Sequence, residues 1–116
     1  MPPYDIAAAL RDHLAWADHF RNALNSADSK VFDLDRAYDH TACELGRWLQ
    51  TDDSRARLGT DRFAHVDRLH QLFHESAFVV ASIFTQHMQA RDIEPFVVEF
   101  ETLSTRLVGL LRQAQG

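Results

Sequence analysis

The chain has 116 residues, a length typical of one domain, so we treat residues 1–116 as a single unit. Its composition, 46% hydrophobic and 25% charged, is that of a folded globular protein. The formal net charge of −5 disfavours a nucleic-acid-binding role, and no run of about 18–20 apolar residues predicts a membrane-spanning helix. No secretory leader is recognisable, and the single cysteine, Cys43, excludes an intrachain disulfide; both features favour the cytoplasm.

The first predicted helix runs from Asp5 to about Leu24. Its apolar side chains recur at steps of three and four residues, so they form one stripe along the helix, and that stripe includes His13 and Trp16. Turn-forming residues at positions 25–29 are expected to end this helix.

Residues 31–48 have the least regular pattern in the chain. Asp33 is a candidate cap for a short helix through Tyr38. Thr41 and Glu44 have the spacing of a capping box, which predicts a helical turn that begins at Thr41 and runs through Trp48. This short segment carries the only cysteine.

Two long helices are predicted in the second half of the chain. Polar residues 51–54 indicate a connection, and Gly59 precedes a helix that extends to about Ala90. Asp92 is the expected cap of the last helix, with Pro95 in its first turn, where the missing N–H removes no hydrogen bond. The buried face of this helix is predicted to contain Phe96, Phe100, Leu103, Leu107, Leu110 and Leu111.

These patterns together define the fold class. Only four glycines and three prolines occur, and no segment alternates apolar and polar residues as strands do. Short connections between helices favour antiparallel neighbours. The sequence therefore predicts an all-α fold, an antiparallel four-helix bundle with a short extra helical segment that carries the cysteine.

Seven histidines are unusual in a chain of this length, and three of them are candidate metal ligands. His70 and His74 are one helical turn apart, so their imidazoles project from the same face of one helix. Such a pair is more often solvated or hydrogen-bonded than metal-bound, so the spacing alone does not predict a site. His13, however, falls on the inward stripe of the first helix, and three imidazoles in so small a core require hydrogen-bond partners or a shared ligand.

Cys43 supplies a fourth candidate ligand. A lone cysteine is ordinarily a small buried apolar residue. Near the start of a helix, however, backbone N–H groups and the helix dipole favour the thiolate, which is the form that binds metal. Three neutral imidazoles and one thiolate, from His13, His70, His74 and Cys43, form a closed tetrahedral set suited to zinc.

Other residues are candidates for supporting roles around such a site. Asp12, Asp39 and Glu44 have the chemistry to accept a hydrogen bond from the far nitrogen of a ligand histidine. His40, three residues before Cys43, is an alternative ligand.

The remaining aromatic residues and histidines have simpler expected roles. Trp16 and Trp48 are expected to be core aromatics that also wall the site from water. Gly46 would let the cysteine segment approach a neighbouring helix. The other three histidines, which are expected to be solvated, are His19, His65 and His87.

No pattern in the chain predicts an enzyme. A zinc protease needs His-Glu-x-x-His, but the residue four positions after His74 is Phe78. A di-iron protein needs several carboxylates beside its histidines, and no Glu-x-x-His occurs on the inward stripes. Four protein ligands would also leave no open position on zinc for a reacting water. A purely structural zinc bundle and a haemerythrin-like metalloprotein remain as alternatives.

Three sequence blocks in order resemble the signature of the chemoreceptor zinc-binding (CZB) domain family. The signature consists of His-x-x-aromatic, Cys-x-apolar-Gly-x-aromatic and His-x-x-x-His, which here are residues 13–16, 43–48 and 70–74. The gaps, residues 17–42 and 49–69, also have the expected size. Carried over by position, the resemblance implies zinc bound by His13, Cys43, His70 and His74.

The resemblance also implies a function. In the family, this helical module forms homodimers, is attached to bacterial chemoreceptors or diguanylate cyclases, and adjusts their output in response to zinc or to oxidants such as hypochlorous acid. This sequence contains no receptor or cyclase segment, so the output module is expected to act in trans or to be missing from this sequence. The apolar surplus in residues 78–80 and in the last helix also suggests a homodimer, and it is equally compatible with a partner protein.

Overall fold

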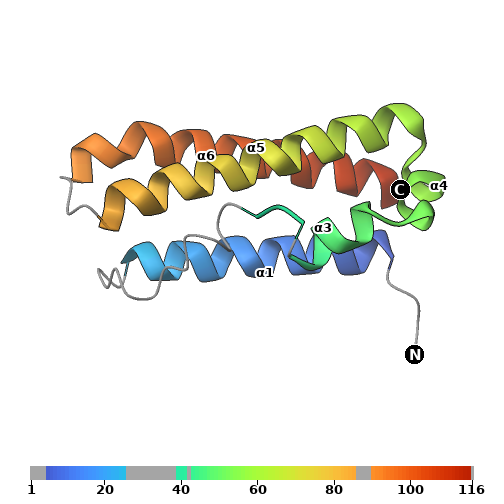
Figure 1. Cartoon of the computed structure of the whole chain (residues 1–116), viewed down its shortest axis with the longest axis horizontal. Coiled ribbons are helices and arrows are strands. Elements are labelled where there is room, and N and C mark those ends of the chain that lie inside the picture. The colour runs from blue at the N-terminus through green and yellow to red at the C-terminus, as the bar shows by residue number, and fades with distance from the viewer. Residues whose placement is uncertain (1–4, 26–38, 42, 86–89, 116) are drawn as a thin grey trace.

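The computed structural model describes residues 5–25, 39–41, 43–85 and 90–115, and every regular element within these ranges is a helix (Figure 1). The predicted all-α class is therefore confirmed for the described residues. In chain order the helices are α1 (Ile6–Asn25), α3 (Glu44–Leu49), α4 (Asp52–Leu58), α5 (Thr60–Thr85) and α6 (Ala90–Gln115). None of these helices is long and apolar enough to cross a membrane. The helix predicted from Asp33 to Tyr38, the turn at 26–29 and the exposure predicted for His87 lie outside the described residues.

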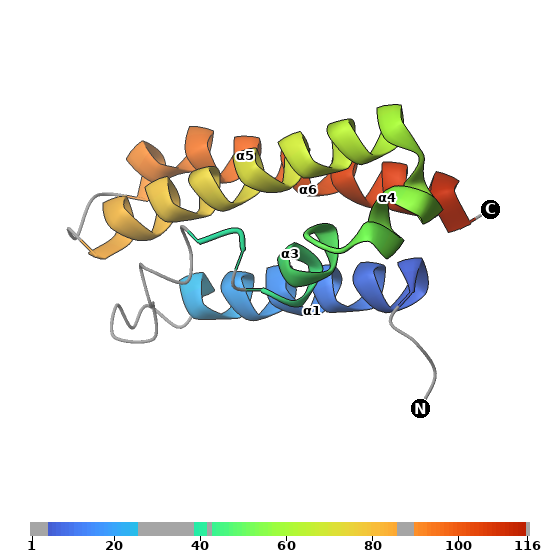
Figure 2. The same cartoon turned by 45° about the vertical axis from the view of Figure 1, so that its right-hand side comes forward.

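The three long helices lie along one another (Figures 1 and 2). Helix α6 runs antiparallel to α5, its most extensive neighbour, and α1 runs in the same direction as α5. The short helices α3 and α4 lie toward the end of the molecule where α1 and α5 begin. These directions agree with those of the first, third and fourth helices of an antiparallel bundle, while the four-helix arrangement itself stays a prediction.

The start of each helix follows from local hydrogen bonds. Asp5 caps α1, because its carboxylate accepts a hydrogen bond from the backbone N–H of Ala8 at 2.9 Å. The polar stretch 51–54 is not the predicted connection, since Thr51 is the N-cap of α4 and its hydroxyl accepts from the N–H of Ser54. Gly59 separates α4 from α5. Its φ of 81° is a backbone angle that glycine adopts readily because it has no Cβ.

The boundaries of the last two helices differ from the predicted ones. Helix α5 ends at Thr85, before the predicted end near Ala90. Helix α6 begins at Ala90, so Asp92 lies inside the helix and not at its cap. Pro95 is consequently beyond the first turn, where its missing N–H forgoes one backbone hydrogen bond. Phe96 is 39% exposed and does not belong to the buried face.

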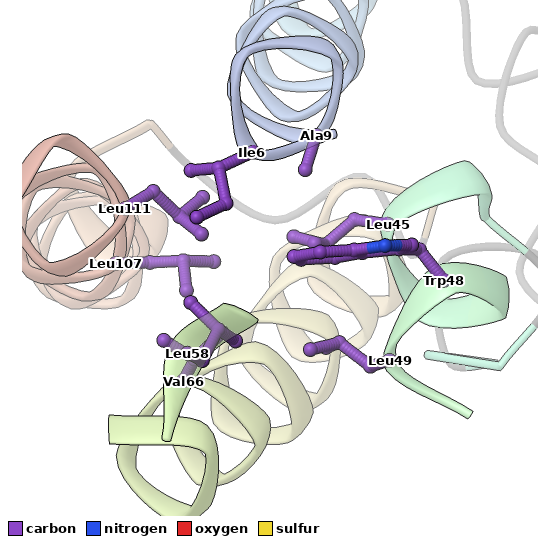
Figure 3. Packing of buried hydrophobic residues seen from close by; sticks show 9 residues of the cluster. All are labelled: Ile6, Ala9, Leu45, Trp48, Leu49, Leu58, Val66, Leu107 and Leu111. Atoms are coloured by element: carbon purple, nitrogen blue, oxygen red, sulfur yellow. The ribbon is translucent and has the colours of Figure 1, made fainter. Parts of the chain in front are cut away.

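Two apolar clusters form the core. The first draws on every described helix and is closed by Trp48, whose ring lies against Leu45 (Figure 3). Its buried members are Ile6, Ala9, Leu45, Trp48, Leu49, Leu58, Val66, Leu107 and Leu111. The second cluster involves only the long helices, and its buried members are Ala17, Phe20, Phe73, Ala77, Val80, Ala81, Phe100 and Leu103.

A group of buried polar residues lies where the two clusters meet along the helices. His13 lies between the two groups of apolar residues on α1, and His70 and His74 occupy the corresponding stretch of α5. Ser104 lies at the same level of α6, between Leu103 and Leu107. Because buried polar groups need partners, this group is where a functional site is expected.

Candidate metal centre

The site contains a pair of buried imidazoles on α5. His70 and His74 are each 1% exposed, and their ring centroids are 4.7 Å apart with an interplanar angle of 80°. Phe73 lies between them in sequence, is fully buried and packs its ring edge against His74. The one-turn spacing seen in the sequence therefore places both rings in the core.

Cys43 reaches these rings from the start of α3. It is the N-cap residue, with extended backbone angles, and its sulfur accepts a hydrogen bond from the N–H of Gly46 at 3.3 Å. The same sulfur is 3.1 Å from Nε2 of His70. The predicted capping box at Thr41 is wrong, because α3 begins at Glu44 and Thr41 donates instead to the carboxylate of Asp39.

The position of Cys43 depends on close contacts within its own segment. A Cβ added at Gly46 would overlap the carbonyl oxygen of His40, so only glycine fits there. The approach that glycine permits is therefore to the preceding stretch of chain and not, as predicted, to a neighbouring helix. The amide of Gln50 also donates to the carbonyl oxygens of Thr41 and Gly46, at 3.3 and 3.1 Å.

Three of the four predicted ligands converge. One ligand atom from each of Cys43, His70 and His74 lies within 4.8 Å of the other two. In a tetrahedral zinc site, with Zn–S near 2.3 Å and Zn–N near 2.0–2.1 Å, ligand atoms are about 3.3–3.6 Å apart. Small side-chain movements thus suffice to place all three on one ion.

His13 borders the site but is not part of this group. Its side chain is 4% exposed and lines the same cavity of about 520 Å³ as Cys43, His70 and His74. Its Nε2, however, is 2.9 Å from the hydroxyl of Ser104 on α6. Sequence reasoning missed Ser104, although a serine within the apolar stripe of α6 is a signal that some buried partner is present.

Burial sets the protonation states of the metal-free site. It lowers the pKa of His13 to about 4 and that of His70 to about 2, with smaller contributions from neighbouring histidines. Both imidazoles are therefore neutral at pH 7, which is the form that binds metal. Burial also raises the pKa of Cys43, and this effect exceeds the opposing hydrogen bond from Gly46. The predicted preference for a thiolate is therefore wrong for the metal-free protein.

The donor set fits a metal ion. Nδ1 of His70 is buried and has no hydrogen-bond partner among the described residues, although leaving such an atom unpaired is unfavourable. A sulfur and neutral imidazole nitrogens are the donors that zinc prefers. Binding would require Cys43 to lose its proton, a change that a bound cation promotes.

The carboxylates proposed as supports have other partners or only border the site. Asp12 and Glu44 line the cavity, but Glu44 pairs with Arg47 at 3.0 Å. Asp39 is exposed, and its hydrogen bonds from Thr41 lower the pKa of its carboxyl group.

The other aromatic residues and histidines lie around the site as follows. The ring centroids of Trp16 and His74 are 4.8 Å apart, and Trp16 lines the cavity at the site. Trp48 belongs instead to the first apolar cluster. His40 lies beside His70, with ring centroids 6.1 Å apart, but outside the converging group. The prediction of solvent exposure is confirmed for the remaining described histidines, His19 and His65.

Comparison with known proteins agrees with this geometry. A family model described as the chemoreceptor zinc-binding domain matches residues 13–81, a segment that begins at His13, includes Cys43, His70 and His74, and ends within α5. Comparison with curated proteins and with solved structures found no match. Because the matched segment is more than half of the chain, the protein belongs to the chemoreceptor zinc-binding domain family.

Proposed function

We propose that the chain is a zinc-binding sensory or regulatory domain that modulates bacterial chemotaxis or cyclic-di-GMP signalling. One observation carries this proposal: ligand atoms of Cys43, His70 and His74 come from two separate segments and still lie within 4.8 Å of one another. His13, which lines the same cavity, is the proposed fourth ligand. The whole chain, residues 1–116, would act as one such domain.

The proposed role follows from where the ligands lie. His13 belongs to α1, Cys43 to the start of α3, and His70 and His74 to α5, so the four side chains would join three segments at one point. When bound, zinc keeps the sulfur as a thiolate and cross-links these segments. Losing any one ligand would loosen the packing of the segment that supplies it. With four protein ligands the site has no position for a reacting water, so we propose a non-catalytic role.

Two inputs suit this arrangement. The zinc concentration would set occupancy by mass action, with weaker binding in acid because the ligands must be deprotonated. Alternatively, the Cys43 thiolate would take the oxygen of hypochlorous acid to form a sulfenic acid, with release of chloride. The first input would change the occupancy of the whole site, and the second would change Cys43, the ligand supplied by the short segment before α3.

Metal analysis tests the ligand set. Purified protein is expected to contain one zinc per chain, and Cys43→Ala and His70→Ala are expected to lose it. His65→Ala is the matched control, because His65 lies on the same helix as His70 but is exposed. A full zinc complement in both ligand variants would overturn the proposal.

Oxidation tests the second input. Hypochlorous acid is expected to release zinc in step with addition of one oxygen to Cys43, followed by mass spectrometry. Unchanged zinc and unchanged Cys43 mass, at doses that leave methionine intact, would refute the oxidant input and leave zinc concentration as the signal.

We propose that the domain acts in the cytoplasm as a homodimer, with a chemoreceptor or diguanylate cyclase as its output module. The exposed apolar side chains Val79, Phe96 and Val98 support a dimer, because such groups favour burial against a partner. A purely structural zinc bundle would instead unfold on chelation without a graded change in assembly. A haemerythrin-like protein would contain iron, whereas the converging group in the described residues contains no carboxylate.

A further inference from the structure

A buried hydrogen bond connects the site to the last helix. Nε2 of His13 and the hydroxyl oxygen of Ser104 are 2.9 Å apart, and the two residues are 91 positions apart in the chain. His13 is 4% exposed and Ser104 is 3% exposed, so water does not substitute for either partner. A buried polar pair of this kind is unfavourable to break, because each group would lose its partner without regaining solvent.

Ser104 differs from the other hydroxyl residues near it on α6. Thr102 and Thr105 are exposed, and their hydroxyls donate to backbone carbonyl oxygens one turn earlier in the same helix, each at 2.9 Å. Ser104 lies instead on the buried face, between the apolar residues Leu103 and Leu107. Its hydroxyl is therefore a buried polar group that needs a hydrogen-bond partner, and His13 supplies it.

The bond at Nε2 decides how His13 can bind a metal. A neutral imidazole carries one proton, on either Nδ1 or Nε2, and the hydrogen bond made by one nitrogen selects the tautomer. If the proton is on Nε2 and is donated to Ser104, the lone pair of Nδ1 is the only one that His13 can offer. Partners of this kind orient ligand histidines in metal sites generally.

We propose that Ser104 is a positioning residue for the metal site: its hydroxyl accepts the Nε2 proton of His13 and so presents Nδ1 to the metal. This inference rests on the proposed function, in which His13 is a ligand. It brings α6 into the site, although the segment matched by the family ends at residue 81 and α6 begins at Ala90.

Zinc affinity of the full chain, measured by competition with a chromogenic chelator, tests this role. Ser104→Ala is expected to weaken zinc binding by about 10- to 100-fold, the usual effect of losing a partner that orients a ligand histidine. Thr105→Ala, which removes an exposed hydroxyl one residue away, is expected to bind zinc as the unaltered chain does. Ser104→Thr keeps the hydroxyl and is expected to recover most of the affinity. Equal affinity of Ser104→Ala and Thr105→Ala would overturn the proposal.

The tautomer gives a readout that a merely structural serine would not change. In the zinc-loaded chain, long-range ¹H–¹⁵N spectra of histidine are expected to show His13 bound through Nδ1 and protonated at Nε2. Coordination through Nε2 would overturn the proposal, since that nitrogen would no longer donate to Ser104.

His13→Ala separates this proposal from the one on which it rests. If this variant binds zinc as tightly as the unaltered chain, His13 is not a ligand and the four-ligand set itself fails. If it binds weakly while Ser104→Ala binds normally, the ligand set stands and only the role of Ser104 is refuted. Urea unfolding of the zinc-free variants confirms that each one is folded before binding is compared.

Discussion

The histidine pair on α5 and the cysteine before α3 reach the same site on very different supports. His70 and His74 belong to a 26-residue helix whose inward residues Val66, Phe73 and Ala77 are fully buried. Cys43 is half-buried and precedes a helix of only six residues. Helix geometry and apolar packing therefore hold the two imidazoles, whereas the sulfur is held by hydrogen bonds within residues 40–50 together with packing of Cys43 against the first apolar cluster.

This difference teaches which ligand is adjustable. The pair on α5 can move only if the core moves, because closely packed interiors resist small displacements. The sulfur can shift when a few local hydrogen bonds change. A change at Cys43 is thus expected to alter the site without unfolding the molecule. A change in the apolar residues that support His70 and His74 is expected to alter the site and also to destabilise the fold.

Removing the apolar support of the α5 pair is expected to have the largest effect. The Phe73 ring contacts His13 at 4.7 Å and Phe100 at 4.7 Å between centroids, within the fully buried core. Phe73→Ala is expected to lower the free energy of unfolding by about 3–5 kcal/mol, measured by urea denaturation. His65→Ala is the control, since His65 is exposed on the same helix and its loss should cost under about 1 kcal/mol. Similar losses in both variants would contradict the comparison.

Acid is expected to have the second-largest effect on stability, through protonation of the buried imidazoles. The pKa values of His13 and His70, about 4 and about 2, lie below the ordinary value of 6.5, so the unfolded chain binds more protons in this range. Their contribution to stability is fully present above pH 6.5 and is lost as pH falls. Between pH 7 and pH 5 the zinc-free protein should lose about 2 kcal/mol for each imidazole.

A histidine variant isolates this effect. His13→Gln should reduce the slope of unfolding free energy against pH, whereas Thr105→Ala, which removes an exposed side chain without a titratable group, should leave it unchanged. Cys43 should not contribute in this range, because burial raises the pKa of its thiol and it stays protonated in both states. A slope that is the same in all three proteins would show that the buried imidazoles do not titrate as described.

A side chain added at Gly46 tests the support of Cys43. A Cβ there would overlap the carbonyl oxygen of His40, so Gly46→Ala must displace the segment that carries Cys43. We expect a loss of about 1–3 kcal/mol in unfolding free energy and at least about a tenfold loss of zinc affinity. Gly109→Ala is a matched control on α6, where a Cβ meets nothing within 4 Å, and it should stabilise the helix by about 0.5–1 kcal/mol. Unaltered zinc affinity in Gly46→Ala would show that the cysteine segment tolerates the displacement.

The smallest expected effect comes from Gln50. Its amide joins the carbonyl oxygens of Thr41 and Gly46 across the cysteine segment. Gln50→Ala should cost about 0.5–1.5 kcal/mol and weaken zinc binding only a few-fold, measured by the same chelator competition. Gln71→Ala, which removes an amide that bonds Asp67 on α5, should leave zinc affinity unchanged. If Gln71→Ala weakens zinc binding more than Gln50→Ala does, the hydrogen bonds of Gln50 do not support the position of Cys43 as described.

The sequence predicted best the features that depend on helical periodicity. The stripe of α1 correctly placed His13 in the interior, and that of α5 predicted at least one of His70 and His74 there, because burial follows directly from position on a helix; both are buried. Helix α4 was missed, since its seven residues are mostly polar and its start looks like a loop until Thr51 is seen to cap it. Periodicity carries no signal for so short a polar helix.

Features that depend on competing interactions, or on contacts between residues far apart in the chain, could not be predicted from the sequence. Thr41 matched a capping pattern, yet Cys43 took the capping role. The thiol pKa was predicted in the wrong direction because burial, which only the fold reveals, exceeds the effect of the nearby N–H groups. Ser104 pairs with a residue 91 positions away, and no local pattern encodes such a pair.

The capping role of Cys43 has a consequence for α3 itself. Six residues are too few for a helix to persist by its own hydrogen bonds, so α3 depends on how its first turn is closed. The sulfur that faces the imidazoles is also the acceptor that closes this turn through the N–H of Gly46. An alkyl group on that sulfur would add bulk at the point where the Gly46 N–H meets it, so alkylation of Cys43 is expected to disturb the first turn of α3 as well as the ligand.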